Sequence, residues 1–228
     1  MSHENLLKKP LLEFWHFLEN TLQNWKLKVQ TMTDIILASK SVHRQTLLEN
    51  AGVNFIAQSA DINEREVETP LIEAGLGGED VAEVLAIAKA TEISKANVDT
   101  YVIGCDQTLS LGGELLHKVA NMEEAQRRLL QLSGQKHQLN AAASLVRNGE
   151  VIWSHVEVAT ITMRELDPGF IGRHLSDAGE KILSSVGAYQ IEGLGVQLFE
   201  KVEGDYFSII GLPVLPLLAE LRKLGLVE

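Results

Sequence analysis

Acidic and basic side chains stand in this sequence at spacings that suit chemistry on a charged substrate. In the stretch GCDQTLSLGGELLHK, Asp106 directly follows a short apolar run, and Lys118 comes twelve residues later, beyond a double glycine. The Asp106 carboxylate can activate water, bind a divalent cation or attack a phosphorus atom directly. A single Asp at a strand end also commonly caps a turn, so these residues alone leave its role open.

Two neighbours of Asp106 bear on which of these reaction mechanisms the site could use. Aspartyl-phosphate enzymes of the haloacid dehalogenase type carry a second Asp two positions after the first, and Thr108 stands there in this chain, which weakens a covalent mechanism. Cys105 is the single cysteine. Its apolar neighbours predict a buried structural thiol rather than a nucleophile, and the lack of a second cysteine favours a reducing compartment, the cytoplasm.

The composition is that of a folded protein, with 45% hydrophobic and 22% charged residues in 228. A net charge of −11 argues against general attraction to nucleic acid, and a small polyanion would need a local cluster of Lys and Arg or a bridging cation. No apolar run approaches the roughly 18 to 20 residues that cross a bilayer, so we expect no membrane partner.

Residues 1–33 differ from the rest of the chain and are interpreted as an N-terminal extension. Residues 11–25 can form an amphipathic helix, which is also compatible with docking or peripheral membrane binding. We favour a dispensable extension and expect deletion of residues 1–31 to leave activity intact. The functional domain is then residues 34–228.

From residue 34 onward, strand-like and helix-like segments alternate, which predicts an α/β layer architecture. The predicted strands are 34–39, 55–61, 101–105, 137–146 and 151–163, and the predicted helices are 42–52, 81–97, 122–134, one beginning at Pro168, and 215–225. Ser41, Asn121 and Asp167 are the expected N-caps, and Asn148-Gly149 is the expected hairpin turn. Asp106 is expected just beyond the carboxyl end of its strand, where functional groups gather in parallel sheets.

Seven ordered segments closely resemble the Maf family of nucleoside triphosphate pyrophosphatases over residues 35 to about 226. They read LASKSVHRQTLLENAGVNF, DINE, AKA, GCDQTLSLGGELLHK, LSGQKH, VGAYQIEGLG and GDYFSIIGLP. The resemblance implies an elongated mixed sheet with helices on both faces and two lobes around a charged cleft, as in inosine triphosphatase. It also implies hydrolysis of a nucleoside triphosphate between the α and β phosphates, assisted by Mg²⁺ or Mn²⁺, and a possible homodimer.

The resemblance assigns roles that the individual residues do not reveal. Asp106 matches the family's proton acceptor, and Arg44, Glu64, Lys89 and Lys118 match its other charged cleft positions, with Glu64 and Asp106 as metal ligands. Taken singly, Arg44 and Lys89 would be solvated helix residues and Glu64 a loop carboxylate. The three cations suit a triphosphate, because pyrophosphate departs with concentrated negative charge.

Three positions concern the nucleobase. Gln107 and Glu192 resemble the branch of the family that hydrolyses 7-methyl-GTP, and His43 is a partial match to an aromatic residue of that branch. A Glu carboxylate can accept hydrogen bonds from N1 and N2 of guanine, and an imidazole can stack on a methylated, cationic purine. The alternative is the dTTP/UTP branch, which has Ser-Pro-Arg-Arg where this chain has Ser-Val-His-Arg.

Several other positions depart from the family pattern, and a second class of function stays open. The departures are Val42, Asn63, His117, Ala141, Ser184 and Ser185. A non-catalytic nucleotide sensor that restrains septum formation is the alternative to an enzyme. His137 is expected either to line the cleft or to make a structural hydrogen bond, and the histidine and cysteine spacing predicts no zinc site.

Overall fold

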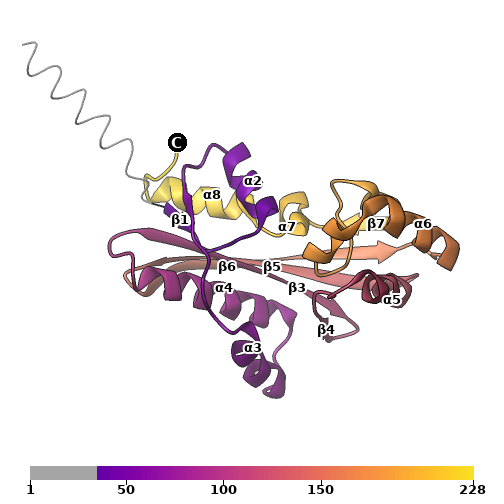
Figure 1. Ribbon diagram of the computed structural model, residues 1–228. Helices are drawn as coiled ribbons and strands as arrows, with labels where there is room; N and C mark the ends of the chain where they lie inside the picture. The colour runs from indigo at the N-terminus through magenta and orange to yellow at the C-terminus, as the bar shows by residue number, and fades with distance from the viewer. Residues whose placement is uncertain (1–34) are drawn as a thin grey trace, which may run out of the picture. The chain divides into compact units, whose positions relative to one another are not determined.

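A seven-stranded mixed sheet forms the centre of residues 35–228, the part of the chain that the computed structural model describes (Figure 1). The predicted helix over residues 11–25 lies outside these residues. The strands are β1 Ile35–Leu37, β2 Ile56–Ala57, β3 Tyr101–Leu111, β4 Glu114–Leu116, β5 Lys136–Arg147, β6 Glu150–Met163 and β7 Phe199–Glu203. Their order is β2-β1-β3-β5-β6-β7, and β4 pairs with β3 beside this row.

The sheet combines both strand orientations. β1 pairs in parallel with β2 and β3, whereas β3, β5, β6 and β7 are joined by antiparallel pairings. The turn between β5 and β6 has φ of 53° at Asn148 and 78° at Gly149, so the Asn-Gly pair supplies the positive φ angles that a tight hairpin requires. The predicted hairpin and the predicted mixed α/β class are confirmed.

Helices cover both faces of the sheet. They are α2 Val42–Asn50, α3 Glu64–Glu73, α4 Gly78–Ser94, α5 Met122–Leu132, α6 Pro168–Ala178, α7 Tyr206–Ile210 and α8 Val214–Lys223, with 3₁₀ turns η1 Glu180–Ser184 and η2 Leu194–Leu198. In Figure 1, α3 and α4 lie on one face and α2, α7 and α8 on the other. None of the helices within 35–228 combines the length and the apolar character that crossing a bilayer requires.

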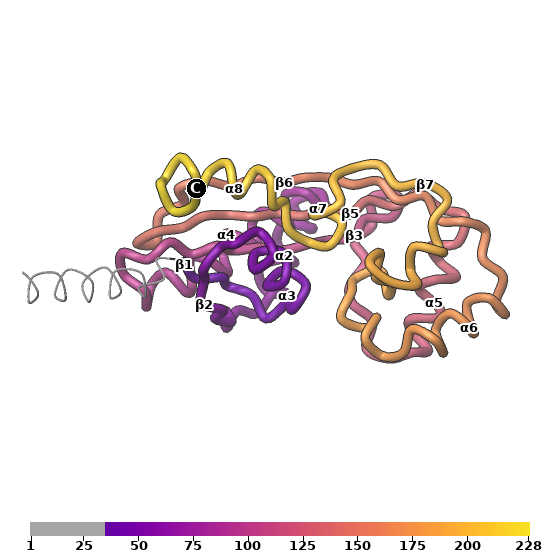
Figure 2. Tube along the Cα trace, turned by 90° about the horizontal axis from the view of Figure 1, so that it is seen from above, coloured from indigo at the N-terminus to yellow at the C-terminus, as the bar shows by residue number. Residues whose placement is uncertain are grey.

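The two largest hydrophobic clusters of residues 35–228 lie towards opposite ends of the long strands, one in each of two lobes. One contains Leu37, Leu48 and Leu217 beneath α2 and α8. The other contains Leu129 of α5 and Ile171 of α6. Figure 2 shows α5 and α6 at one end of the domain and α2, α3 and α8 towards the other, with β3 and β5 running between the two lobes.

The predicted helix starts are confirmed by their caps. Asn121 accepts a hydrogen bond from the Glu124 amide at 2.9 Å, and the Glu124 carboxylate accepts one from the Ala120 amide at 2.9 Å. Asp167 caps α6 by accepting from the Phe170 amide at 2.9 Å. These side chains replace the hydrogen bonds that the first turn of a helix cannot make internally.

Two predictions about local structure were wrong, and the strand predicted over 55–61 is limited to the two residues of β2. Residues 64–73 form α3 rather than a loop, although Pro70 lies inside this helix and few apolar residues mark a buried face. The strand predicted over 101–105 continues to Leu111, because the polar side chains of Thr108 and Ser110 are buried by hydrogen bonds to Asn140 of β5 instead of facing water. A run of polar residues therefore hid the second half of β3.

Candidate functional site

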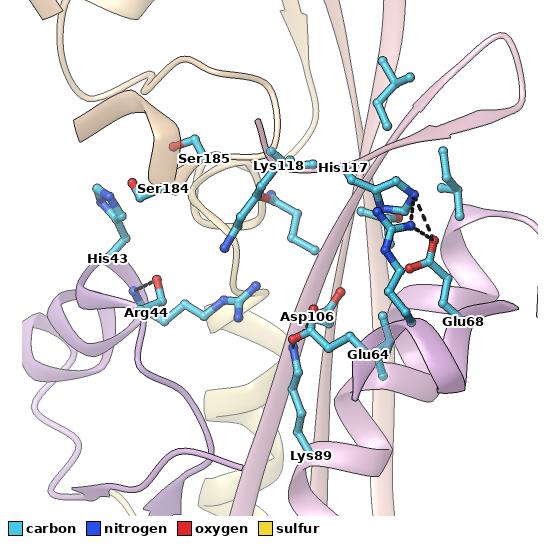
Figure 3. A pocket seen from close by; sticks show the side chains of 18 of the residues that line it. His43, Arg44, Glu64, Glu68, Lys89, Asp106, His117, Lys118, Ser184 and Ser185 are labelled. Carbon is cyan, nitrogen blue, oxygen red and sulfur yellow. Dashed lines mark hydrogen bonds and ion pairs between the residues drawn. The ribbon is translucent and has the colours of Figure 1, made fainter. Parts of the chain in front are cut away.

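A cleft of about 330 Å³ lies between the two lobes and is lined from both of them. The five charged residues expected to act together all line it: Arg44, Glu64, Lys89, Asp106 and Lys118. They come from α2, α3, α4, β3 and the segment after β4. Figure 3 shows Asp106 near the middle of the group, with Glu64 and Lys89 beside it.

Asp106 lies within β3 and not beyond its end, which corrects its expected position. Its side chain is 11% exposed. Oδ1 accepts a hydrogen bond from Lys89 Nζ at 2.5 Å, while Oδ2 has no hydrogen-bond partner among residues 35–228. One carboxylate oxygen therefore stays available to a water molecule in the cleft.

Lys89 lies between two carboxylates. Its ammonium is 2.5 Å from Asp106 Oδ1 and 2.7 Å from Glu64 Oε1, and its side chain is only 13% exposed. Burial alone would lower the pKa of Lys89, but the charge of Asp106 and the hydrogen bonds to both carboxylates raise it overall. Burial likewise acts to raise the pKa of Glu64, and its hydrogen bond and attraction to Lys89 lower it overall.

Close packing of α4 on β3 brings Lys89 to Asp106. A Cβ atom at Gly104 would overlap with the backbone oxygen of Ala86 in α4, so only glycine permits this approach two residues before Asp106. At the start of α4, the Gly78 carbonyl accepts a hydrogen bond from the Thr108 hydroxyl at 2.8 Å. Two contacts, four residues apart on one strand, thus fix the position of the helix.

Arg44 is held by backbone oxygens. Its Nε donates to the Gly211 carbonyl at 2.8 Å and its Nη1 to the Cys105 carbonyl at 3.0 Å, so the guanidinium is oriented without a carboxylate partner. Ser41 caps the helix that carries Arg44. The Cys105 side chain is fully buried, as predicted for a structural thiol.

Lys118 forms no hydrogen bond or ion pair with any residue of 35–228. Burial and the charge of Arg44 lower its pKa, and Glu64 and Asp106 offset this only in part. The chain returns to the cleft through Gly112 and Gly113, whose φ angles of 59° and 89° form the turn between β3 and β4. This turn brings Lys118 into the same cleft as Asp106.

His43, Gln107 and Glu192 line a recess that adjoins the cleft. His43 Nδ1 is 3.1 Å from Glu192 Oε1, and His43 Nε2 is 3.2 Å from Gln190 Nε2. Gln107 Nε2 donates to the carbonyls of Ser208 and Ile209 at 2.9 and 3.0 Å. Because both amide donors are used, Gln107 can offer a ligand only its acceptor oxygen.

The acidic groups of the cleft suit a cation that the protein and a bound phosphate ligand coordinate together better than a metal ion coordinated by protein groups alone. Within residues 35–228, no three His, Cys, Asp or Glu side chains are grouped closely enough to hold a metal ion. Glu64 and Asp106 nevertheless converge on one positive charge, that of Lys89. Mg²⁺ commonly takes one or two carboxylates and completes its shell with phosphate oxygens and water, so this donor set fits it.

Sequence reasoning missed part of the lining. Arg65 and Glu68, from the unpredicted helix α3, line the cleft together with His117, Ser184 and Ser185, which were noted only as departures from a pattern. The spacing Glu64, Arg65, Glu68 would have been informative had α3 been recognised, since residues three and four apart share a helix face.

His137 makes a structural hydrogen bond, one of the two roles expected for it. Its Nε2 is 2.6 Å from the Tyr189 hydroxyl, and its side chain is buried. Burial lowers the pKa of His137 to about 4, which keeps the ring neutral. His137 supports Tyr189, a residue of the recess, rather than lining the cleft itself.

The arrangement can bind a polyanion and activate water beside it. Arg44 and Lys118 present positive charge that no carboxylate neutralises directly, and Asp106 presents a free oxygen as a base. A partly buried setting strengthens such charge interactions relative to water. Hydrolysis of a phosphate anhydride is the reaction class that uses both features.

This chain is similar in sequence to several named proteins. A protein named 7-methyl-GTP pyrophosphatase from Mesorhizobium japonicum is 62% identical over 194 residues, covering 85% of this chain and 98% of that protein. One of the same name from Brucella abortus is 59% identical over 189 residues, covering 83% and 95%. A solved dITP/XTP pyrophosphatase from Mycobacterium abscessus shows 15% identity and a TM-score of 0.38 over 84% of this chain and 95% of that one.

Residues 34–224 match the family model described as Maf-like protein, which covers nearly the whole of the part that the structure describes. The match and the high identity of the relatives agree in extent. This chain therefore belongs to the Maf family.

Proposed function

We propose that this protein hydrolyses a nucleoside triphosphate between its α and β phosphates, releasing a nucleoside monophosphate and pyrophosphate, and that it prefers a modified purine nucleotide such as 7-methyl-GTP. The observation that carries the proposal is the free Oδ2 of Asp106 beside three cations in one cleft. Relatives at 62% and 59% identity bear the name 7-methyl-GTP pyrophosphatase, which supports the substrate.

In the proposed reaction, Asp106 Oδ2 orients a water molecule and accepts its proton as the water oxygen attacks the α phosphorus. The bond from this phosphorus to the bridging oxygen breaks, and its electron pair leaves with pyrophosphate. Lys118 and Arg44 stabilise the growing negative charge, and Lys89 keeps Asp106 oriented through Oδ1. Glu64 and Asp106 would hold Mg²⁺ or Mn²⁺ together with the phosphates, and the cation supplies further charge neutralisation when bound.

The acceptors in the recess support a guanine base. Glu192 offers carboxylate oxygens, and Gln107 offers only its amide oxygen because its donors are bonded to α7. Guanine presents adjacent N1–H and N2–H donors on one edge, which match two acceptors. A dTTP or UTP base presents a single such donor and would leave one acceptor unpaired, at a cost of about 1 to 3 kcal/mol.

A substrate panel tests the proposal. Purified protein is incubated with 7-methyl-GTP, GTP, dTTP and UTP in the presence of Mg²⁺ or Mn²⁺, and pyrophosphate release is measured. We expect kcat/KM to favour 7-methyl-GTP over dTTP by at least about tenfold. Hydrolysis of none of the four would end the enzymatic proposal, and equal kcat/KM values would end the base preference.

The base preference is tested separately by Glu192→Gln. This change removes one acceptor oxygen and should reduce the preference for 7-methyl-GTP over dTTP about tenfold while leaving hydrolysis of the anhydride in place. Glu200→Gln, on the exposed part of β7, is the matched control and should change neither value. An unchanged preference in Glu192→Gln would remove Glu192 from base recognition.

The domain assignment is also a proposal. Residues 35–228 form one compact unit that contains the five charged residues of the cleft, which supports residues 34–228 as the functional domain and residues 1–33 as dispensable. A chain without residues 1–31 should keep kcat/KM within about twofold of the full chain. The cytoplasmic location and the homodimer stay predictions.

A further inference from the structure

The cleft continues past Asp106 to a second group of charged side chains. Arg65 and Glu68 of α3 and His117, directly after β4, line the same cavity as Asp106. In Figure 3, His117 and Glu68 lie on one side of Asp106 and His43 lies on the other. This group, which we call the Arg65 cluster, is therefore at the end of the cleft away from the recess that His43 lines.

The contacts within the Arg65 cluster cannot all be satisfied together. His117 Nε2 is 2.7 Å from Arg65 Nη1 and 3.1 Å from Glu68 Oε1. One imidazole nitrogen either accepts a hydrogen bond from Arg65 or donates one to Glu68, never both. Glu68 Oε1 is buried without a hydrogen bond, and Arg65 Nη1 lies 3.7 Å from it, too far for one.

In the ligand-free protein, the contacts favour a neutral His117 that accepts from Arg65. Burial lowers the pKa of His117, and Arg65 and Arg128 of α5 lower it further, while Glu68 opposes them. The buried carboxylate of Glu68 is then left without a donor. Such a group is costly in a partly enclosed site, so protonation of His117 is favoured only when Arg65 moves away from it.

An anion would resolve this conflict. The Arg65 side chain is 62% exposed and can turn from His117 towards a ligand in the cleft, while the Glu68 side chain is only 7% exposed and stays in place. His117 Nε2, released from Arg65, can then be protonated and donate a hydrogen bond to Glu68 Oε1. The cluster then has one net positive charge facing the anion, where before its charges cancelled.

We propose that Arg65 and His117, supported by the buried carboxylate of Glu68, form the subsite for the terminal phosphates of the substrate and for the pyrophosphate product. The inference rests on the proposed function, because a base in the recess and an α phosphate beside Asp106 direct the remaining phosphates towards this end. The competing path runs past Arg44 into a cavity of about 780 Å³ that Lys40 and Lys181 line.

Calorimetric titrations with magnesium pyrophosphate and with 7-methyl-GMP test the subsite. Arg65→Gln should raise the Kd of pyrophosphate about tenfold, because a charge-assisted hydrogen bond to phosphate is lost. The Kd of 7-methyl-GMP, which lacks the terminal phosphates, should change less than about twofold. Arg65→Lys should restore part of the affinity for pyrophosphate.

Proton uptake gives a second readout that a structural role would not move. Titrations in buffers of different ionisation enthalpy measure the protons taken up when pyrophosphate binds. His117→Gln should take up fewer protons than the unchanged protein, because the imidazole that accepts one is gone. Arg127→Gln, which changes an exposed, ion-paired Arg of α5 outside the cleft, should leave both Kd values and the proton uptake unchanged.

Four results would overturn the subsite. The first is an unchanged Kd of pyrophosphate in Arg65→Gln, and the second is an equal rise in the Kd values of pyrophosphate and 7-methyl-GMP in that variant. The third is a rise in the Kd of pyrophosphate in Lys40→Gln but not in Arg65→Gln, and the fourth is the absence of pyrophosphate binding by the unchanged protein. Equal weakening would indicate that the cluster only anchors α3 to β4. These titrations measure binding without turnover, so a failure of the subsite is distinct from a failure to hydrolyse nucleotides.

Discussion

Lys89 and Lys118 point into one cleft from opposite electrostatic settings. Lys89 lies between the carboxylates of Glu64 and Asp106, and the net effect of its surroundings is to raise its pKa. Lys118 has no ion pair with any residue of 35–228, and burial with the charge of Arg44 lowers its pKa. One ammonium is stabilised by the fold, and the other is destabilised by it.

This difference in electrostatic environment gives the two lysines different roles in the site. The Lys89 group is complete without a ligand, so it fixes the position of the base Asp106 and adds to stability. Lys118 carries a positive charge that no carboxylate pairs with directly. Partial burial of this charge is unfavourable in the ligand-free protein, and a bound phosphate would relieve it, which strengthens phosphate binding. The same residue type thus supplies rigidity at one position and binding at the other.

The largest effect is expected from replacing Asp106, the carboxylate that lies in the cleft with both lysines. Asp106→Asn leaves the Lys89–Glu64 ion pair and the unpaired Lys118 but removes the proton acceptor, and kcat should fall about 10³-fold. Single-turnover pyrophosphate release measures the loss, and calorimetric titration with 7-methyl-GTP should still show binding. Retention of a tenth of kcat would exclude Asp106 as the base.

The same variant addresses the alternative of a nucleotide sensor. A septation phenotype in cells that survives Asp106→Asn undiminished would show that binding, not hydrolysis, is responsible. Loss of the phenotype together with kcat would support the enzyme.

Replacing Lys89 tests whether this lysine stabilises the fold. Lys89→Met leaves the carboxylates of Glu64 and Asp106 without their shared partner, and the free energy of unfolding should fall by about 2 to 3 kcal/mol. The estimate is at the low end for a broken buried pair because Glu64 is half exposed. Urea unfolding measures the change, and a loss below about 0.5 kcal/mol would contradict a structural role.

Replacing Lys118 tests the binding side. Lys118→Met should raise the KM for the triphosphate about tenfold, since one charge-assisted contact is lost. The ligand-free protein should be no less stable than before, because an unpaired and partly buried charge has been removed. A loss of stability as large as that of Lys89→Met would erase the distinction between the two lysines.

The smallest effect is on the pH dependence of stability near the ordinary lysine pKa of 10.5. The raised pKa of Lys89 stabilises the fold below 10.5, and this contribution is lost as pH rises past 10.5, so the destabilisation by Lys89→Met should shrink there. The lowered pKa of Lys118 has the opposite sign. Its penalty is present at lower pH and fades as pH rises towards 10.5, so any gain from Lys118→Met should fade over that range.

Urea unfolding of the two variants and the unchanged protein between about pH 8 and pH 11 measures both trends. Parallel curves for the two variants would show that the two ammonium groups share one environment.

Local signals in the sequence were sufficient for much of the fold. The caps at Ser41, Asn121 and Asp167 and the Asn148-Gly149 turn act within a few residues, and each lies where it was predicted. Helix α3 escaped notice because Pro70 lies inside it and few apolar residues mark a buried face. Such a helix depends on its tertiary packing, which a single sequence does not display.

Residue types and their order along the chain determined the chemistry: an acid, three cations and a turn that returns one of them. Only the tertiary structure decided which cation is paired. Glu64 and Lys89 come from two helices, and their contact with Asp106 depends on how closely α4 packs on β3 at Gly104. Electrostatic environment is set by distance and burial, and both arise from packing between segments far apart in sequence.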